Sequence, residues 1–369
     1  MLLSTRTSLI LMGTVVALVL FAAPARAATH EVQPGESIQA AIDAAQPGDT
    51  IHVAAGVYHE NLTITTDGIE LRGDGASDSG TVLMPAATAT PSECTDPTTS
   101  AVNGICVPGE TDPQTGEPGR PVRGVTIEGF LVDGFSGSGV LAFVAHEFTV
   151  NDTEARNNTG YGISGFALND VSFKDSVARD NGEPGFYVGD SPDADAELVG
   201  NSAIHNGVGT EEGFGFFLRD SSDGVVKENF ASDNCVGFVF VDTGENPDPV
   251  NDWTAKHNFA SGNNGACPSG TDGGPATSGT GILLGGTHNV TVKRNGVFNN
   301  TPSLESPFSG GIVVASTTAL GGADPTNNTV KKNVARGNLP ADIVWDGTGQ
   351  GNVFNDNRCG SSNPDGLCE

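Results

Sequence analysis

Residues 224–234 read GVVKENFASDN, and residues 253–263 read WTAKHNFASGN. Similar segments align with these two without gaps, and they begin at Phe148, Val171, Ala196, Val290, Asn328 and, truncated, at Asn352. The third position is always apolar, the eighth is Ala or Val in every complete copy, and the eleventh is Asn. Because apolar and polar positions alternate rather than follow the 3.6-residue period of a helix, the repeats are predicted to be short strands joined by tight turns.

Each repeat continues into a second strand signature, in which a glycine precedes alternating apolar residues. This signature occurs at Gly162, Gly185, Gly215, Gly237, Gly281 and Gly311. A unit this short cannot bury an apolar face alone, so the units are expected to stack into a solenoid with parallel strands. Asparagine, which also occupies most sixth positions, suits the turns because it tolerates the left-handed conformation and can bond to its stacked neighbour.

The segment before the repeats predicts a cap. Residues 36–45 read ESIQAAIDAA, and residues 47–51 (PGDTI) and 56–60 (GVYHE) follow. Residues 37–46 form a short amphipathic pattern with Ile38, Ile42 and Ala45 on one face. Together with the repeats, this stretch resembles the right-handed parallel β-helix proteins of the pectate-lyase-like superfold, including NosD-type and carbohydrate-binding repeat proteins. The resemblance implies one all-β domain, residues 28–369, of about ten coils with a short N-terminal capping helix.

The N-terminus predicts export. Arg6 precedes the apolar residues 9–23, and Ala25-Arg26-Ala27 has the small-x-small form of a cleavage site, so residues 1–27 are predicted to be a secretory signal peptide. We expect a secreted or cell-envelope/periplasmic protein with no later membrane span. The 45 Asp+Glu against 17 Lys+Arg give a net charge of -28, which disfavours nucleic acid as a partner.

Six cysteines fit an oxidising compartment. Sequence alone leaves the connectivity open, but proximity along the chain suggests three pairs: Cys94 with Cys106, Cys235 with Cys267, and Cys359 with Cys368. Residues 85–122, rich in Pro, Thr and Gly, are predicted to be a long loop insertion pinned by the first pair. The closely spaced ligand pairs of a zinc site are missing.

An outward-facing row is predicted on the glycine-led strands. Alternation directs outward the side chains of Ser164, Tyr187, Phe217, Val239, Leu283 and Val313. Tyr187 and Phe217 could stack on sugar rings. The alternative interpretation is that long neighbouring loops or a partner chain cover the row.

Just past the same strands, Asp190, Asp220 and Asp242 are predicted to lie in register, with Arg219 beside them. Nearby loops add further acids, namely Asp193, Asp195, Glu245 and Asp248. An oxygen-rich cluster suits Ca²⁺, the one cofactor that the sequence indicates. Three interpretations stay open: calcium with Arg219 as catalytic base or substrate clamp, calcium that only ties loops, and solvated turn aspartates.

A basic row lies at the fourth repeat position. It comprises Lys174, Lys227, Lys256, Lys293 and Lys331, with His257, Arg294 and Lys332 flanking it. The row could bind a polyanionic glycan along the coils. Alternatively, the lysines only solubilise the sheet and pair with acids such as Glu228.

For function, the resemblance implies enzymes that act on acidic polysaccharides. The sequence lacks the motifs of three enzyme classes in this superfold. These are the paired-Asp and Arg-Pro-Trp motifs of the esterases, the Gly-His-Gly of the hydrolases and the Asp-Pro-His of the epimerases. We therefore expect a protein that binds or processes a polysaccharide or cell-envelope glycan in a loop-walled groove. One alternative is a calcium-dependent lyase acting on uronate glycans, with Arg219 or a lysine of the row as base. Another is a non-catalytic structural or adhesion protein that uses the apolar row as a subunit contact. The sequence leaves the oligomeric state open.

Overall fold

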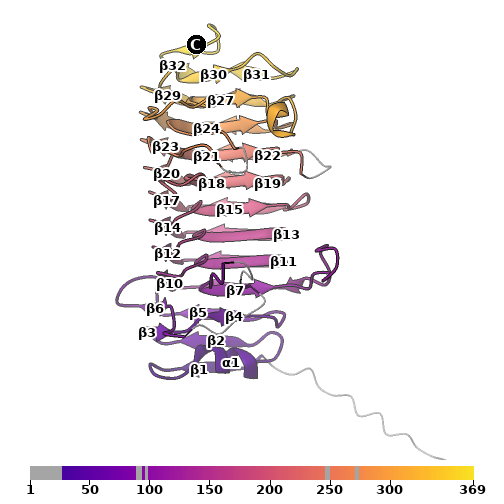
Figure 1. The fold of residues 1–369 in the computed structure, drawn as a ribbon, viewed down its shortest axis with the longest axis vertical. Helices are drawn as coiled ribbons and strands as arrows, with labels where there is room; N and C mark the ends of the chain where they lie inside the picture. Colours follow the sequence, from indigo (N-terminus) through magenta and orange to yellow (C-terminus); the bar gives the residue numbers. More distant parts are fainter. Residues whose placement is uncertain (1–26, 89–93, 96–98, 246–249, 271–273) are drawn as a thin grey trace, which may run out of the picture.

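The computed structural model describes residues 27–88, 94–95, 99–245, 250–270 and 274–369. Residues 1–26 of the predicted signal peptide, and Asp248, lie outside the described residues. The chain winds into a stack of coils in which all paired strands run parallel, with one 22-stranded and one 11-stranded sheet (Figure 1). The predicted parallel β-helix is therefore confirmed, and each coil supplies one strand to the smaller sheet.

The coils present three faces. The first face holds β4 (Leu62–Thr63), β7 (Ile105–Pro108), the starts of β11 (Val140–Asn151) and β13 (Ile163–Lys174), β15 (Phe186–Gly189), β18 (Phe214–Arg219), β21 (Val236–Val241), β24 (Thr280–Gly285), β27 (Gly310–Ala315), β30 (Ile343–Trp345) and β33 (Ser362–Asn363). The second face holds β1 (Thr29–Val32), β2 (Thr50–Val53), β5 (Glu70–Gly73), β9 (Thr126–Glu128), the ends of β11 and β13, β16 (Ala196–Val199), β19 (Gly224–Lys227), β22 (Trp253–Lys256), β25 (Thr291–Lys293), β28 (Thr329–Lys331) and β31 (Val353–Asn355). β8 (Val122–Arg123) pairs with the middle of β11.

The third face is the smaller sheet. It holds β3 (Gly56–His59), β6 (Thr81–Met84), β10 (Phe130–Asp133), β12 (Glu154–Arg156), β14 (Val177–Arg179), β17 (Ser202–Ile204), β20 (Phe230–Ser232), β23 (Phe259–Ser261), β26 (Gly296–Phe298), β29 (Val334–Arg336) and β32 (Arg358–Cys359). The long strands β11 and β13 join the first and second faces, which is why these two faces form one sheet.

The interior is filled by the predicted columns. Third-position residues such as Phe173 and Val226, and eighth-position residues such as Ala203, are fully buried. The rings of Phe186, Phe216 and Phe238 stack on consecutive coils, with centroids 4.8 and 4.7 Å apart. Such stacking adds aromatic contact to the apolar burial that holds the coils together.

The asparagines form hydrogen-bonded ladders inside the turns. Asn258 Nδ2, for example, donates to Val226 O (2.8 Å) and to Asn295 Oδ1 (3.1 Å), and Asn258 N donates to the same Oδ1 at 2.8 Å. The predicted stacking is confirmed, but the left-handed residue is not the ladder asparagine. It is the residue before it, as at His257 (φ 58°) and Arg294 (φ 57°), because this turn directs the asparagine side chain inward.

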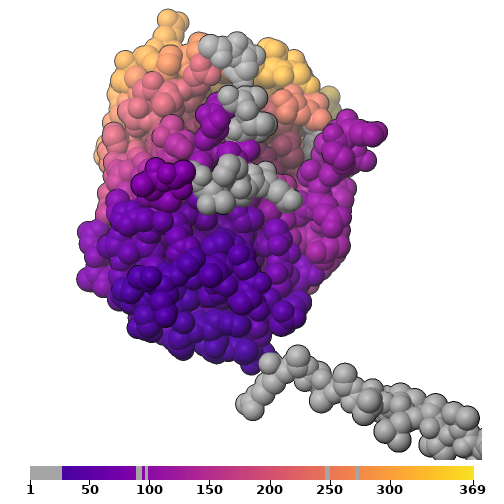
Figure 2. Space-filling view, turned by 60° about the horizontal axis from the view of Figure 1, so that its bottom comes forward, coloured from indigo at the N-terminus to yellow at the C-terminus, as the bar shows by residue number. Residues whose placement is uncertain are grey.

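The predicted capping helix is present as α1 (Ile38–Ala44), which lies at the N-terminal end of the stack. Ser37 Oγ accepts from Ala40 N, and Ile38, Ile42 and Ala45 are buried, as the pattern predicts. Figure 2 shows the first coils, in indigo, closing this end of the molecule. No helix of the described residues is long and apolar enough to span a membrane.

The three predicted disulfides are present: Cys94–Cys106, Cys235–Cys267 and Cys359–Cys368. The prediction that residues 85–122 form only a loop is wrong, because they contain β7, which pairs with β4 and β11. Ile105 and Val107 point into the core and Cys106 carries the disulfide. The short alternating run Ile-Cys-Val was hidden among the surrounding turn-forming residues.

Candidate functional site

The outward row of the first face is covered rather than open. Register places Tyr187 beside Phe217, Phe217 beside Val239, and Val239 beside Leu283. These side chains are 1–5% exposed and form a second apolar cluster, separate from the interior. Since the described part of the chain already buries the row, the row does not offer the subunit contact expected for a structural protein. The interpretation that loops cover it agrees with the structure.

A cleft of about 740 Å³ lies over this row. Phe217, Val239 and Leu283 contribute its floor, and the short 3-10 helix at Thr318–Leu320 contributes Leu320 to a wall. Another wall contains Gly270, Gly274 and Pro275, from a segment that the disulfide Cys235–Cys267 fixes to the residue before β21. Loops of the later coils therefore build a groove over the strands.

Phe217 and Tyr187 have different surroundings. Phe217 lines the cleft, where the 5% of its surface that is exposed offers a ligand a small apolar contact rather than a whole ring face. Tyr187 is covered by the rings of Tyr161 and Phe166, whose centroids each lie 4.8 Å from its own. At 1% exposure the ring of Tyr187 is not available to stack on a sugar, which corrects that part of the prediction.

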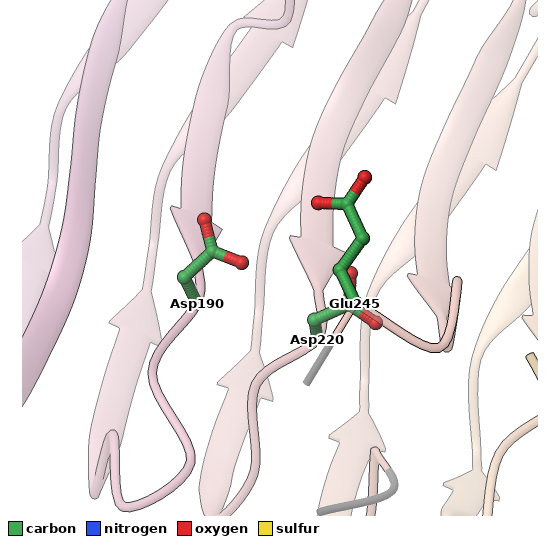
Figure 3. A group of neighbouring side chains, drawn as sticks. All are labelled: Asp190, Asp220 and Glu245. Carbon is green, nitrogen blue, oxygen red and sulfur yellow. The ribbon is translucent and has the colours of Figure 1, made fainter. Parts of the chain in front are cut away.

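The predicted aspartates follow consecutive first-face strands in register. Asp190 N donates to Arg219 O, and Asp220 N donates to Val241 O. The carboxylates that meet are those of Asp190, Asp220 and Glu245, with oxygens within 4.8 Å of one another (Figure 3). Asp242 is not in this group, because its Oδ1 accepts from Gly244 N at 2.8 Å and closes its own turn. Glu245 takes the position predicted for Asp242.

Arg219 is held among these carboxylates. Its Nε lies 3.3 Å from Asp220 Oδ2, and its Nη2 contacts Glu245. Burial works against the charge, but Tyr187 and the three carboxylates outweigh it and raise the pKa of Arg219. A guanidinium that stays protonated cannot act as the predicted base. It can act as the predicted clamp, since its side chain is 24% exposed and lines the cleft.

Burial also changes the pKa values of Asp190 and Tyr187. Burial, reinforced by Asp220 and Glu245 and opposed by Arg219, raises the pKa of Asp190. Burial raises the pKa of Tyr187, and the neighbouring guanidinium of Arg219 opposes that rise. The buried hydroxyl has no hydrogen bond of good geometry among the described residues. A buried hydroxyl without a partner is costly to keep, and a ligand or a water molecule could satisfy it.

The predicted calcium ion would compete with Arg219. Calcium takes six to eight oxygen ligands, and Asp190, Asp220 and Glu245 offer carboxylates. However, Asp220 Oδ1 accepts from Thr243 N at 2.8 Å, and Oδ2 accepts from Thr243 Oγ1 at 2.5 Å as well as facing Arg219. The guanidinium is thus the cation at this place in the structure, and a metal ion would have to displace it. The calcium site stays a prediction.

Sequence reasoning missed the acids at the other end of the cleft. Glu183 precedes β15, and Glu211 and Glu212 precede β18, so all three come from the same turn of consecutive coils. Burial, reinforced by Glu212, raises the pKa of Glu183 to about 7. The available signal was the recurrence of Glu between the eleventh-position asparagine and the glycine-led strand. A carboxyl group with this pKa can give or take a proton near neutral pH.

The predicted lysine row lies elsewhere, on the second face. Lys227, Lys256, Lys293 and Lys331 are paired in register on β19, β22, β25 and β28. None of them lines the cleft. Lys174 is separated from the other four by Val199 and forms an ion pair with Glu197 at 2.7 Å. The structure therefore does not bring the lysines together with Arg219, which leaves no row lysine placed to act as a base there.

Comparisons with known proteins agree with the architecture. Residues 92–253 match the family described as "Right handed beta helix region". The A-module of the mannuronan C-5 epimerase AlgE4 of Azotobacter vinelandii is 17% identical, with a TM-score of 0.51 over 87% of this chain and 90% of that one. An alginate lyase from Paenibacillus is 15% identical, with a TM-score of 0.53 over 88% and 99%. No match was found among curated proteins. At these identities the likeness establishes the fold, a right-handed parallel β-helix.

Proposed function

We propose that this right-handed parallel β-helix protein binds a polysaccharide in the first-face cleft and transfers a proton to or from it through Glu183. The observation that carries the proposal is the pairing of two unlike sites at the ends of one cleft floor. At one end, burial raises the pKa of Glu183 to about 7, and at the other end Arg219, with 24% of its side chain exposed, is a permanent cation. Such a split between a proton-transfer group and a fixed charge is typical of active sites.

The floor supports a sugar as the ligand. Phe217, Val239 and Leu283 give it an apolar surface, and the walls add carboxylates and hydroxyls such as those of Thr210 and Thr243. Pockets for small ligands combine such apolar lining with a few oriented polar groups. The two solved structures reported above are named as enzymes of alginate and its mannuronan form, which agrees with a glycan substrate.

β-Elimination on a uronate glycan is favoured by Arg219. Its guanidinium would hold the carboxylate of one uronate unit. At the other end of the floor, the carboxylate of Glu183 would take the proton from the carbon that carries the carboxylate of another unit of the same chain. The C–O bond to the neighbouring sugar then breaks, its electron pair leaves with the oxygen, which takes up a proton, and a C=C bond remains. This step differs from the calcium-dependent lyase that the sequence offered as an alternative, because Glu183 rather than Arg219 or a row lysine is the base and Arg219 is the clamp.

Hydrolysis is the second candidate, favoured by the excess of acids. Glu183, Glu211, Glu212 and Glu245 line the cleft, and Arg219 is the one basic side chain among its described lining residues. This charge balance suits a sugar of low charge, to which protonated Glu183 would donate. The product separates the candidates, because elimination gives an unsaturated sugar that absorbs in the ultraviolet and hydrolysis gives a new reducing end without it.

A binding experiment tests the location of the ligand. Affinity gels with a panel of neutral and uronate polysaccharides should retard the wild type, and Phe217→Ala and Arg219→Gln should weaken that retardation. Val353→Ala, an exposed strand position on the second face, is the control. Retardation that is equal in the wild type and both cleft variants would rule out the cleft as the binding site.

A further inference from the structure

A second surface on the molecule has the features of a binding site. On the second face, Lys227, Lys256, Lys293 and Lys331 stand in register on four neighbouring strands. Strands in a sheet lie about 4.8 Å apart, and like charges placed directly opposite each other destabilise a sheet. Lys227 pairs with Glu228 at 3.1 Å, whereas Lys256, Lys293 and Lys331 form no ion pair with any described residue. The row keeps uncompensated positive charge on a chain of net charge -28.

Two more cations extend the row at the corner of the coil. Arg294 and Lys332 occupy the next position on consecutive coils, both left-handed with φ 57° and both exposed. Only Lys332 approaches an acid, with Nζ 3.9 Å from Asp356. The left-handed turn directs these side chains away from the coil, so the positive charge continues around the corner.

Beyond that corner, phenylalanines stack on the outside of the third face. The ring of Phe259 lies 5.8 Å from that of Phe230 and 5.2 Å from that of Phe298, centroid to centroid. Phe259 is 40% exposed, although large apolar side chains are usually buried. Gly296 leaves room for this arrangement, because a β-carbon there would press on the rings of Phe298 and Phe259.

We propose that this basic–aromatic corner, made of the four lysines with Arg294, Lys332 and the three phenylalanines, binds a linear anionic polysaccharide along the solenoid axis. The cations repeat at the strand spacing, so they can contact successive acidic groups of an extended chain. The phenyl rings offer flat apolar surfaces to the apolar faces of sugar rings. Electrostatic screening over about 8 Å at physiological ionic strength keeps the rest of the negative surface from cancelling this local attraction.

The corner is separate from the first-face cleft and would serve a different purpose. None of its residues lines the cleft, and its charge is opposite to that of the cleft walls. It would hold the protein on an anionic polymer while the cleft acts on a segment of glycan. The inference does not rest on the proposed catalytic activity, because binding at the corner needs neither Glu183 nor Arg219.

The test compares variants in the Glu183→Gln background, so that no turnover disturbs binding. Affinity gels would contain polygalacturonate, alginate, neutral dextran or duplex DNA. The triple change Lys256→Gln, Lys293→Gln and Lys331→Gln should weaken retardation by polygalacturonate or alginate roughly tenfold, and 1 M salt should remove the difference between the parent and this variant. Phe259→Ala should weaken it as well. Lys174→Gln, the paired lysine of the same row, is the matched control and should bind like its parent.

The outcomes are decisive in either direction. Loss of retardation in the triple variant, with an unchanged or higher melting temperature, supports the corner as the binding surface, since relief of repulsion should not unfold the coils. Equal retardation of parent and triple variant overturns the proposal. The proposal is also overturned if neither polygalacturonate nor alginate retards the parent, or if only DNA retards it. Arg219→Gln added to the parent should leave the lysine-dependent, salt-sensitive part of the retardation intact, whatever it removes from the part that the cleft contributes.

Discussion

The phenol of Tyr187 lies against the α-carbon of Gly189, in space that any β-carbon at position 189 would fill. Both residues belong to β15, and the ring runs along the outside of the strand toward the end where Asp190 and Arg219 lie. Because Gly189 has no side chain, the hydroxyl of Tyr187 can be buried close to Arg219. Among the described residues that line the cleft, Arg219 is the only basic one. Gly189 is needed for space and not for an unusual backbone.

Gly189→Ala should therefore disturb the site through packing alone. Alanine accepts the strand conformation of this residue, so the cost is that of an overpacked position, about 1–3 kcal/mol in the free energy of unfolding. Displacement of Tyr187 should also lower glycan binding. Urea denaturation and affinity gels measure the two effects, and full stability together with full binding would show that the contact does not matter.

Tyr187→Phe should separate stability from function. The change removes a buried hydroxyl that has no partner among the described residues, so the folded protein should be as stable or about 1 kcal/mol more stable. If a sugar oxygen satisfies this hydroxyl, affinity for the glycan should fall at the same time. A large loss of stability would instead mean that the hydroxyl is already bonded within the folded protein.

Ionisation of Glu183 should make the free energy of unfolding depend on pH. Its pKa rises from an ordinary 4.5 to about 7, so the folded chain binds the proton more tightly than the unfolded chain. Stability should fall as pH increases from about 4.5 to about 7 and then level off. Melting temperatures of Glu183→Gln should lack this part of the decline with pH. A decline identical to that of the wild type would contradict the raised pKa of Glu183.

The same pKa gives opposite pH profiles for the two candidate reactions. A base for elimination must be ionised, so activity should rise with pH through about 7. An acid for hydrolysis must be protonated, so activity should fall through the same range. Initial rates between pH 5 and 9 distinguish the two, and a profile without a step near pH 7 would exclude Glu183 from the rate-limiting proton transfer.

Calcium should bind better once Arg219 is gone. Arg219→Gln removes the guanidinium from the group of Asp190, Asp220 and Glu245 and leaves its carboxylates uncompensated. We expect the melting temperature of this variant to rise with added calcium by more than that of the wild type. A rise in the wild type that the variant does not exceed would show that calcium and Arg219 do not compete.

The asparagine ladder should be a main source of stability. Asn258→Ala leaves Val226 O without its donor and removes the acceptor of Asn229 N and Asn229 Nδ2, all inside the coil. Two or more unpaired buried groups should cost about 3 kcal/mol or more. Asn355→Ala, at an exposed strand position, is the control. Similar unfolding midpoints for both variants would contradict the role of the ladder.

The repeating part of the fold could be predicted because each coil repeats one pattern. Alternation identified the buried columns, and the ladder positions followed from asparagine at every coil. The left-handed positions were misassigned by one residue, since some of them, such as Arg294 and Lys332, carry residue types that rarely adopt this conformation. Stacking of the neighbouring asparagine, a tertiary contact, imposes that conformation.

The candidate site was harder to predict because it depends on loops. Register placed Asp190, Asp220 and Arg219 correctly, but the turn after β21 brings in Glu245 rather than Asp242. The raised pKa of Glu183 results from burial and from Glu212 on the next coil, and no local sequence pattern predicts either of them. Loop closure over the first face likewise turned a row of outward side chains into the floor of a cleft.

The most direct test of the central claim is product formation by the purified protein, compared between the wild type and Glu183→Gln on the same panel of polysaccharides. Ultraviolet absorbance and reducing ends would be followed together. The account predicts product from at least one glycan with the wild type, and none with a Glu183→Gln variant that still binds that glycan. Product from both proteins at equal rates, or binding without product from the wild type across the panel, would contradict it.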